Sequence, residues 1–139
     1  MFIVTHATKK DIYDYFQIDK HLPKWEYESK IRDKRCYIIG YNKKTIGVMR
    51  YNLLFDSIPF LTLIFVDKPY RNKGFGKQAL QFWEKEMGQL GHKMVITSTQ
   101  IDEEAQHFYR KLGYIDKGGL FFDNTPFEQP QELFMVKVL

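Results

Sequence analysis

Cysteine is almost absent from this sequence, since Cys36 is the only one among 139 residues. A single cysteine excludes an intramolecular disulfide, so a reducing, cytoplasmic compartment is the expected location. Long apolar runs are also missing, because no stretch approaches the roughly 18 residues that a membrane-spanning helix needs. Residues 1–4 lead directly into polar sequence. We therefore expect neither a transmembrane segment nor a signal peptide.

Histidine and clustered charge are scarce as well. The four histidines are scattered and, with one cysteine, do not have the spacing of a metal site. Lysines are spread along the chain, although the net charge is +4 and the pI is about 9.0. A nucleic-acid-binding domain would gather its basic residues in a patch or stripe. We therefore rank nucleic-acid binding last among the possible functions, while the positive charge suits a smaller anionic ligand.

The composition that is present predicts a folded protein. Hydrophobic residues make up 44% of the chain and aromatic residues 17%, which argues against disorder. Neither repeats nor low-complexity tracts interrupt the sequence. Residues 1–139 are therefore expected to form one domain with its own core.

The most informative stretch runs from residue 60 to residue 91. Phe60–Val66 is almost wholly apolar, which predicts a short strand buried on both faces. Asp67–Lys73 is a polar turn, and from Gly74 onward apolar residues recur with a period of 3.6, which predicts an amphipathic helix. Two glycines, Gly88 and Gly91, are expected to close this helix. The apolar positions are Phe75, Ala79, Leu80, Trp83, Met87 and Leu90.

The turn before this helix has the chemistry of an anion site. The first turn of a helix carries unpaired backbone N–H groups and the positive end of the helix dipole. Gly74 and Gly76 allow a ligand to approach the backbone, while Arg71, Lys73 and Lys77 add positive charge. From spacing alone, a tight turn with a solvated basic rim is an equally good interpretation. Neither a Walker A loop nor the dinucleotide fingerprint fits the sequence.

The other elements predict a mixed sheet. Strands are expected over 2–6, 36–41, 45–55, 94–99, 114–122 and 132–139, and helices near 9–19, 24–33 and 102–112. The strands before residue 60 are joined by turns, which implies antiparallel neighbours, and Gly47 is expected to mark a bulge. The strand–helix–strand unit starting at Phe60 should be a right-handed parallel crossover. The fold class is therefore α/β (α+β), with a mixed, mostly antiparallel sheet of six to seven strands and about four helices.

Two motifs resemble those of one known family. Residues 71–76 match the pattern Gln/Arg-x-x-Gly-x-Gly/Ala, the coenzyme A motif of the GCN5-related N-acetyltransferases (GNAT family). Residues 102–114 are similar to that family's segment Asn-x-x-Ala-x-x-Phe/Leu/Ile-Tyr-x-Lys-x-Gly-Phe/Tyr. The resemblance implies the GNAT fold and transfer of an acetyl group from acetyl-CoA to an amine. It assigns cofactor binding to Phe65, Val66, Arg71, Asn72, Lys73, Gly74, Phe75, Gly76 and Lys77.

The same resemblance assigns a catalytic role to Tyr109, as the general acid that protonates the departing CoA thiolate. Its position on an apolar helix stripe is also explained by packing alone, and both interpretations stay open. The family's asparagine is replaced by Asp102, which we expect to cap the helix. A further departure is the absence of a glutamate from Phe60-Leu61-Thr62, so the general base is open among Glu26, Glu28, Asp56 and His107.

The acceptor is expected to be a small-molecule or peptide amine. In the family the first two helices line the acceptor pocket, which here would involve Trp25 and Tyr27, although a surface helix with a few packed aromatics is the simpler interpretation. Cys36 lacks a partnered base and is not expected to be a nucleophile. The protein would act as a monomer or homodimer, without nucleic acid or membrane. The alternative function is a non-catalytic acyl-CoA-binding module.

Overall fold

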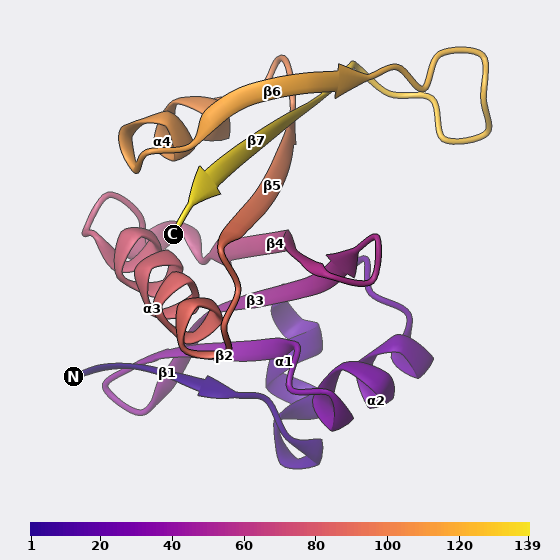
Figure 1. The fold of residues 1–139 in the computed structure, drawn as a ribbon. Coiled ribbons are helices and arrows are strands. Elements are labelled where there is room, and N and C mark those ends of the chain that lie inside the picture. Colours follow the sequence, from indigo (N-terminus) through magenta and orange to yellow (C-terminus); the bar gives the residue numbers. More distant parts are fainter. The chain divides into compact units, whose positions relative to one another are not determined.

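The computed structural model describes residues 1–139 (Figure 1). Its strands are β1 (Phe2–His6), β2 (Cys36–Tyr41), β3 (Lys44–Leu54), β4 (Ile58–Val66), β5 (Met94–Gln100), β6 (Ile115–Leu120) and β7 (Glu132–Val138). Its helices are α1 (Ile12–Ile18), α2 (Lys24–Arg32), α3 (Phe75–Gln89) and α4 (Ala105–Lys111), with 3-10 turns η1 (Lys9–Asp11) and η2 (Lys68–Tyr70). The expected number and order of elements are confirmed.

The seven strands are hydrogen-bonded in the order β1-β2-β3-β4-β5-β7-β6. Neighbours β1/β2, β2/β3, β5/β7 and β6/β7 are antiparallel, whereas β4 and β5 are parallel, with Phe60 opposite Ile96 and Leu61 opposite Thr97. The predicted mixed sheet is therefore confirmed. The chain folds as two compact units, unit 1 (Met1–Asn52 and Thr62–Glu86) and unit 2 (Leu53–Leu61 and Met87–Leu139).

Successive side chains of β2 point to opposite faces of the sheet, and both faces are packed in unit 1. Cys36 and Ile38 join a hydrophobic cluster with Val48 of β3 and with residues of α1 and α2. Tyr37 lies on the other face of β2, where its ring is 6.4 Å from that of Phe82 in α3. Figure 1 shows α1 and α2 on one side of β1–β3 and α3 on the other. Because side chains alternate along a strand, one strand serves both layers.

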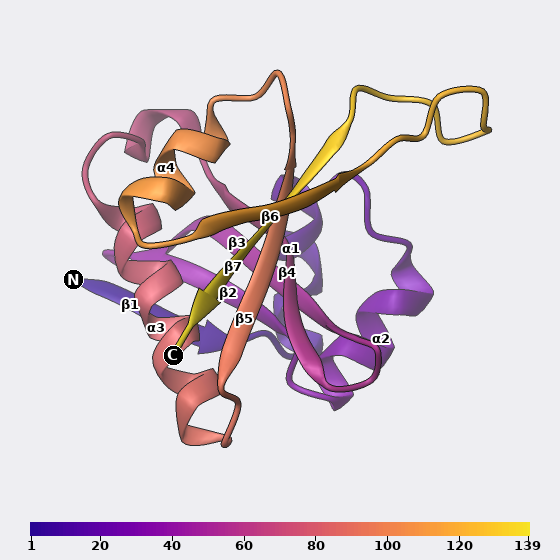
Figure 2. The same cartoon turned by 45° about the horizontal axis from the view of Figure 1, so that its top comes forward.

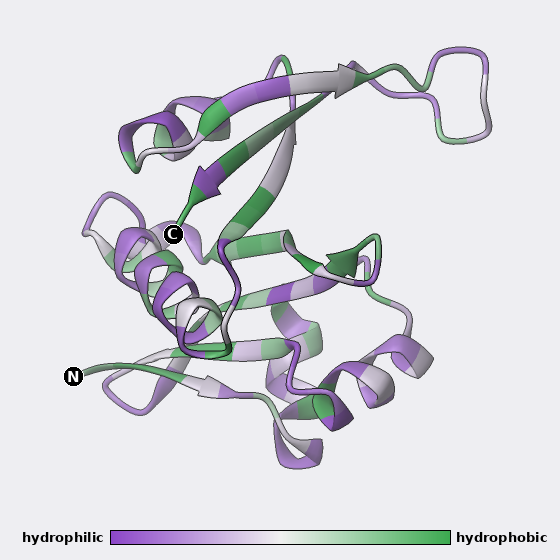
Figure 3. Cartoon of the chain, viewed as in Figure 1, coloured by the Kyte–Doolittle hydropathy of each residue, from purple (hydrophilic) through white to green (hydrophobic).

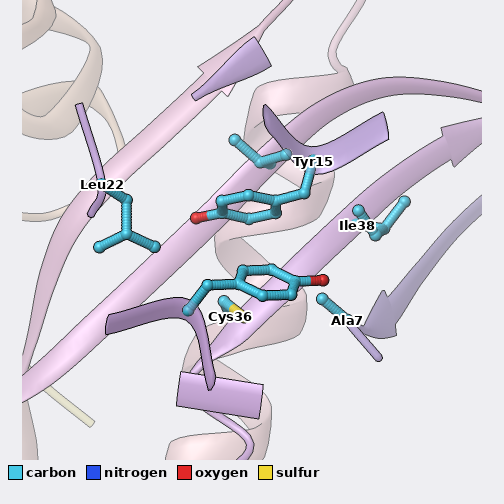
Figure 4. Close-up of a cluster of buried hydrophobic side chains, with 7 residues drawn as sticks. Ala7, Tyr15, Leu22, Cys36 and Ile38 are labelled. Atoms are coloured by element: carbon cyan, nitrogen blue, oxygen red, sulfur yellow. The ribbon is translucent and has the colours of Figure 1, made fainter. Parts of the chain in front are cut away.

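The cluster beside α1 and α2 has aromatic rings at its centre. Tyr15 is fully buried, and its ring centroid lies 4.9 Å from that of Tyr27. Figure 4 shows the ring of Tyr15 directed toward Leu22, with Ile38 on the opposite side of the cluster. Ile12, by contrast, does not belong to this cluster and is 42% exposed. Ile12 is the first residue of α1. The buried residue of this helix is Tyr15, which lies one helical turn before Asp19.

A buried ion pair ties the end of α1 to β3. The carboxylate of Asp19 accepts hydrogen bonds from Arg50 Nε at 2.8 Å, from the Tyr15 hydroxyl at 2.9 Å, and from the backbone N–H groups of His21 and Leu22. Burial by itself would raise the pKa of Asp19, but the hydrogen bonds from Arg50 and His21 outweigh it, so this pKa lies below its usual value. One carboxylate therefore organises the α1–α2 connection.

Helix α3 follows its predicted apolar stripe except at Leu90, which lies one residue past the end of the helix and is 63% exposed. Ala79, Leu80, Trp83 and Met87 are fully buried, and Figure 3 shows hydrophobic and hydrophilic residues alternating along α3. Gly91, with φ +96°, ends the helix as expected. Gly88 lies inside α3 and does not close it, because the last residue of the helix is Gln89.

Unit 2 is built around β5, β7 and β6. β5 pairs with β7 over its whole length, and the loop between β6 and β7 extends beyond the ends of both strands (Figure 2). All residues of β6 are exposed, and its register shifts between Asp116 and Gly118. The strand predicted for 114–122 is shorter in the structure, where it spans Ile115–Leu120 and pairs with β7 on both sides of this shift.

Removing the Asp19 carboxylate should destabilise the protein. Asp19→Ala leaves Arg50 without its partner, so we expect the free energy of unfolding to fall by about 3 kcal/mol. Asp33→Ala, at an exposed ion pair with Arg32, is the matched control and should cost less than about 0.5 kcal/mol. Denaturant unfolding monitored by circular dichroism measures both.

The effect of Asp19 should also depend on pH. Its pKa is lower in the folded than in the unfolded chain, so its stabilisation is complete above about pH 4 and is lost as the pH falls toward the folded-state value. The stability difference between wild type and Asp19→Ala should therefore narrow on acidification. A difference that stays constant down to about pH 2 would contradict this role.

Candidate functional site

The candidate cofactor site begins where β4 ends in unit 1. The N–H of Asp67 donates to the carbonyl oxygen of Ile46 at 2.7 Å, which holds the strand end against β3. A Cβ on Gly47 would collide with the carbonyl oxygen of Phe65 and approach Val66 Cα to 3.2 Å. The predicted bulge is confirmed beside this glycine, because Ile39 and Gly40 of β2 face Gly47 and Thr45 of β3. Only glycine permits the two backbones to come this close.

Strand β4 is expected from its sequence to be buried on both faces, but in the structure only some of its residues are buried. Leu61 is 2% exposed, whereas Phe65 is 36% exposed. Residues 62–64 and 66 have intermediate exposure. The apolar run therefore predicted the strand correctly but not its burial, because apolar residues also occur on protein surfaces and an apolar run does not by itself fix burial.

The turn after β4 leads directly into the N-terminus of α3. Asn72 has φ +61° and Gly74 has φ +84°, both in the left-handed region. The carbonyl oxygen of Gly74 accepts from Gln78 N–H at 3.0 Å, which begins the helix. No atom lies within 4 Å of where a Cβ of Gly74 would stand. The first N–H groups of α3 therefore follow directly after an open position without a side chain, an arrangement that suits an anion.

The charged and aromatic residues of the turn do not all face the same way. Lys73 and Lys77 are exposed, as is Asn72. Arg71 is exposed too, but its Nε donates to the carbonyl oxygen of Val66 at 2.7 Å. The ring of Phe75 is engaged inside unit 1, stacked on Phe2 with centroids 5.4 Å apart and 4.8 Å from Tyr41. Two of the sequence-predicted cofactor residues, Arg71 and Phe75, thus also hold the turn in place.

Tyr109 lies in unit 2, on α4. Its side chain is 5% exposed, and its ring is 5.5 Å from that of Tyr114. Burial raises the pKa of Tyr109, while the hydrogen-bonded side chain of Thr97 on β5 partly opposes that effect. The phenol therefore stays protonated at neutral pH. This state suits a proton donor and equally suits a packed core residue.

The segment before α4 differs from the expectation. Asp102 was expected to cap the helix, but α4 begins at Ala105 and its N-cap is Glu104, which makes no side-chain capping bond. Glu103 accepts from the N–H of Gln100 at 2.9 Å. Asp102 is exposed and stands too early in the chain to reach the first turn of α4. Gly113, with φ +95°, ends the helix as predicted.

The general-base candidates are spread over separate elements. The side chain of His107 is 59% exposed, and its Nε2 lies 3.7 Å from Oε2 of Glu104. On β4, where a glutamate is missing, the hydroxyl of Thr62 accepts from Arg50 Nη1 at 3.1 Å and donates to the Arg50 carbonyl oxygen at 3.2 Å. Sequence reasoning missed Arg50, although a lone arginine in an apolar strand is a signal for a buried ion pair.

Other predicted residues fall outside any catalytic arrangement. Cys36 is fully buried, and burial raises its thiol pKa to about 12, which agrees with its exclusion as a nucleophile. Tyr27 is buried in the core, whereas Trp25 is 69% exposed. No group of three or more metal-ligating side chains is found. None of the helices has the length and apolar character needed to cross a membrane.

Seven strands in a mixed sheet with four helices define the acyl-CoA N-acyltransferase fold. Residues 5–114 match the sequence profile of the acetyltransferase (GNAT) family. Because this match covers most of the chain, the protein belongs to the GNAT family of acetyltransferases. The predicted family and enzyme class are thereby confirmed. No curated protein sequence matches the chain.

Solved structures share the fold over nearly the whole chain. A GNAT-family acetyltransferase from Bacillus cereus ATCC 10987 is 24% identical, with a TM-score of 0.79 over 99% of this chain and 97% of its own. A GNAT-family acetyltransferase from Elizabethkingia anophelis, with acetyl-CoA bound, is 18% identical, with a TM-score of 0.80 and coverage of 99% and 98%. A ribosomal-protein-alanine N-acetyltransferase from Brucella melitensis is 20% identical, with a TM-score of 0.81 and coverage of 99% of both chains.

The open position at Gly74 leads to a prediction for ligand binding. Gly74→Val places a branched side chain before the first N–H groups of α3 and should weaken binding of CoA by at least about tenfold. Gly91→Val is the matched control, because Gly91 also has a positive φ and open space around it but lies at the other end of α3. Calorimetric titration with CoA measures both.

Equal losses of affinity in the two glycine variants would contradict this prediction, since backbone strain alone would then explain them. Lys68→Ala serves as a second comparison. Lys68 lies before the segment Arg71–Lys77 that is expected to bind the cofactor, so its removal should weaken CoA binding less than Gly74→Val does.

Proposed function

We propose that this protein transfers the acetyl group of acetyl-CoA to a primary amine and that its 139 residues act as one domain. The observation that carries the proposal is the β4 end, the glycine turn and the N-terminus of α3 within a GNAT-family chain. The cofactor pyrophosphate would bind at the turn from Arg71 to Lys77, and Phe65 and Val66 would lie along the pantetheine arm. The bound acetyl-CoA of the Elizabethkingia anophelis structure supports this cosubstrate.

The reaction would be a direct attack on the thioester. The neutral amine nitrogen forms a bond to the carbonyl carbon, and the backbone N–H at Val66 polarises the carbonyl oxygen. The carbon–sulfur bond then breaks, the thiolate leaves, and Tyr109 supplies a proton to the sulfur. The amine loses a proton to a base or to water. Products are the acetylated amine and CoA.

The environment of Tyr109 supports its role as the acid. A group that donates a proton must carry it before the reaction, and burial of Tyr109 favours the protonated phenol. A CoA thiolate that forms in an apolar setting is strongly basic relative to its value in water, which favours proton transfer from the phenol. The acceptor is proposed to be a small-molecule or peptide amine. The Brucella melitensis enzyme, by its name, acts on a protein alanine.

One observation favours a second candidate, a non-catalytic acyl-CoA-binding module. No carboxylate stands at Phe60–Thr62, and the Thr62 hydroxyl is bound to Arg50. An amine panel with acetyl-CoA, read by release of free thiol, separates the two functions. Turnover with any amine supports the enzyme. Binding of acetyl-CoA without thiol release from any acceptor supports the module.

Ligand stabilisation tests the cofactor independently of the acceptor. A ligand that binds only the folded state at 100 times its Kd adds about 2.7 kcal/mol to the free energy of unfolding. CoA and acetyl-CoA should therefore raise the melting temperature by several degrees. NAD and ATP at the same concentration should raise it less. A larger shift with ATP or NAD would overturn the assignment of acetyl-CoA.

Tyr109→Phe separates catalysis from packing. The substitution keeps the ring and removes only the hydroxyl, so kcat should fall by about 10²–10⁴-fold while the acetyl-CoA Kd changes only a few-fold. Tyr114→Phe, at the neighbouring buried tyrosine, is the control and should leave kcat nearly unchanged. Wild-type kcat in Tyr109→Phe, at an unchanged melting temperature, would remove Tyr109 from the mechanism.

A further inference from the structure

The side chain of Arg71 turns back toward the strand that precedes it. Its Nε donates to the carbonyl oxygen of Val66 at 2.7 Å, five residues earlier. Its guanidinium carbon lies 4.8 Å from the ring centroid of Phe65, a cation–π contact. Both contacts are to the last residues of β4. Lys73 and Lys77, in the same turn, are exposed, and neither makes a contact of this kind with β4.

The hydrogen bond from Arg71 Nε completes the fixation of one peptide group. The carbonyl oxygen of Val66 and the N–H of Asp67 belong to the same peptide plane. Arg71 holds the carbonyl, and Ile46 on β3 accepts from the N–H at 2.7 Å. On the β3 side Gly47 has no side chain that could support Phe65 or Val66. Without Arg71, this plane would be held from β3 alone.

We propose that Arg71 is a positioning residue that fixes the orientation of the β4 end and does not serve as a ligand of the cofactor phosphates. This inference rests on the proposed function, because the β4 end is where the thioester carbonyl would be polarised. It assigns Arg71 a task different from that of Lys73 and Lys77. The orientation of the Val66 backbone, and not the charge of Arg71, is then what the reaction requires.

Side-chain geometry supplies a matched pair of test variants. The Nε2 of glutamine stands the same number of bonds from Cα as the Nε of arginine, so Arg71→Gln keeps a donor at this position and loses the charge. Arg71→Lys keeps the charge but places a methylene where the donor was. A positioning role predicts that Arg71→Gln retains the function of Arg71 and that Arg71→Lys does not. A phosphate ligand predicts the reverse.

Amide hydrogen exchange at Asp67 is the readout that needs neither an acceptor nor a cofactor. In Arg71→Lys this amide should exchange about ten- to a hundredfold faster than in wild type, because its peptide plane has lost one of two supports. In Arg71→Gln its protection should stay within about threefold of wild type. Equal protection in all three proteins would overturn the inference, whether or not the protein proves to be an acetyltransferase.

Turnover with two acyl donors provides the second readout. S-Acetylpantetheine carries the thioester without the pyrophosphate. A positioning defect in Arg71→Lys should lower kcat/KM by a similar factor, about tenfold or more, with acetyl-CoA and with S-acetylpantetheine. A fall in kcat/KM that is seen only with acetyl-CoA, and in Arg71→Gln but not in Arg71→Lys, would make Arg71 a phosphate ligand and overturn the proposal. Failure of the wild type to use any amine would count against the proposed function, while the exchange result would still decide the role of Arg71.

Discussion

The close approach of β3 and β4 at Gly47 is the constraint on which the geometry of unit 1 depends. No side chain can stand between Gly47 and the backbone at Phe65, so the strands meet with only main-chain atoms between them. The bulge beside Gly47 and the Ile46–Asp67 hydrogen bond lie next to this contact. A strand end held this closely gives the turn and the first residues of α3 a fixed starting point, which a preorganised anion site requires.

A second constraint is electrostatic. Asp19 brings together the end of α1, the following loop and β3, because a buried carboxylate must collect hydrogen-bond donors wherever the chain supplies them. Arg50 satisfies that carboxylate and also reaches the hydroxyl of Thr62. The side chains of Asp19, Arg50 and Thr62 are therefore hydrogen-bonded to one another, and β4 itself contains no carboxylate or histidine that could act as a general base. In the proposed reaction, proton removal from the amine would pass to water or to a residue on another element.

Tyr109 can be interpreted as a packed core residue or as a general acid, and the structure is consistent with both roles at once. Burial on α4 makes the residue part of the core of unit 2, and the same burial raises the pKa of its phenol. A general acid must remain protonated until charge develops on the leaving group, and an apolar environment ensures this. Packing and proton donation are thus compatible, and what separates them is whether the hydroxyl is used.

The sequence by itself determined the order of elements, the mixed sheet, the helix from 75 to 89 and the glycine turn before it, since periodicity, capping and glycine placement act over a few residues. The tertiary structure alone decided that Tyr15 anchors α1, that Asp102 caps no helix, and that Arg50 pairs with Asp19. It also decided that Arg71 contacts β4. These are contacts of individual side chains whose direction depends on the backbone around them, and spacing along the chain does not specify that direction.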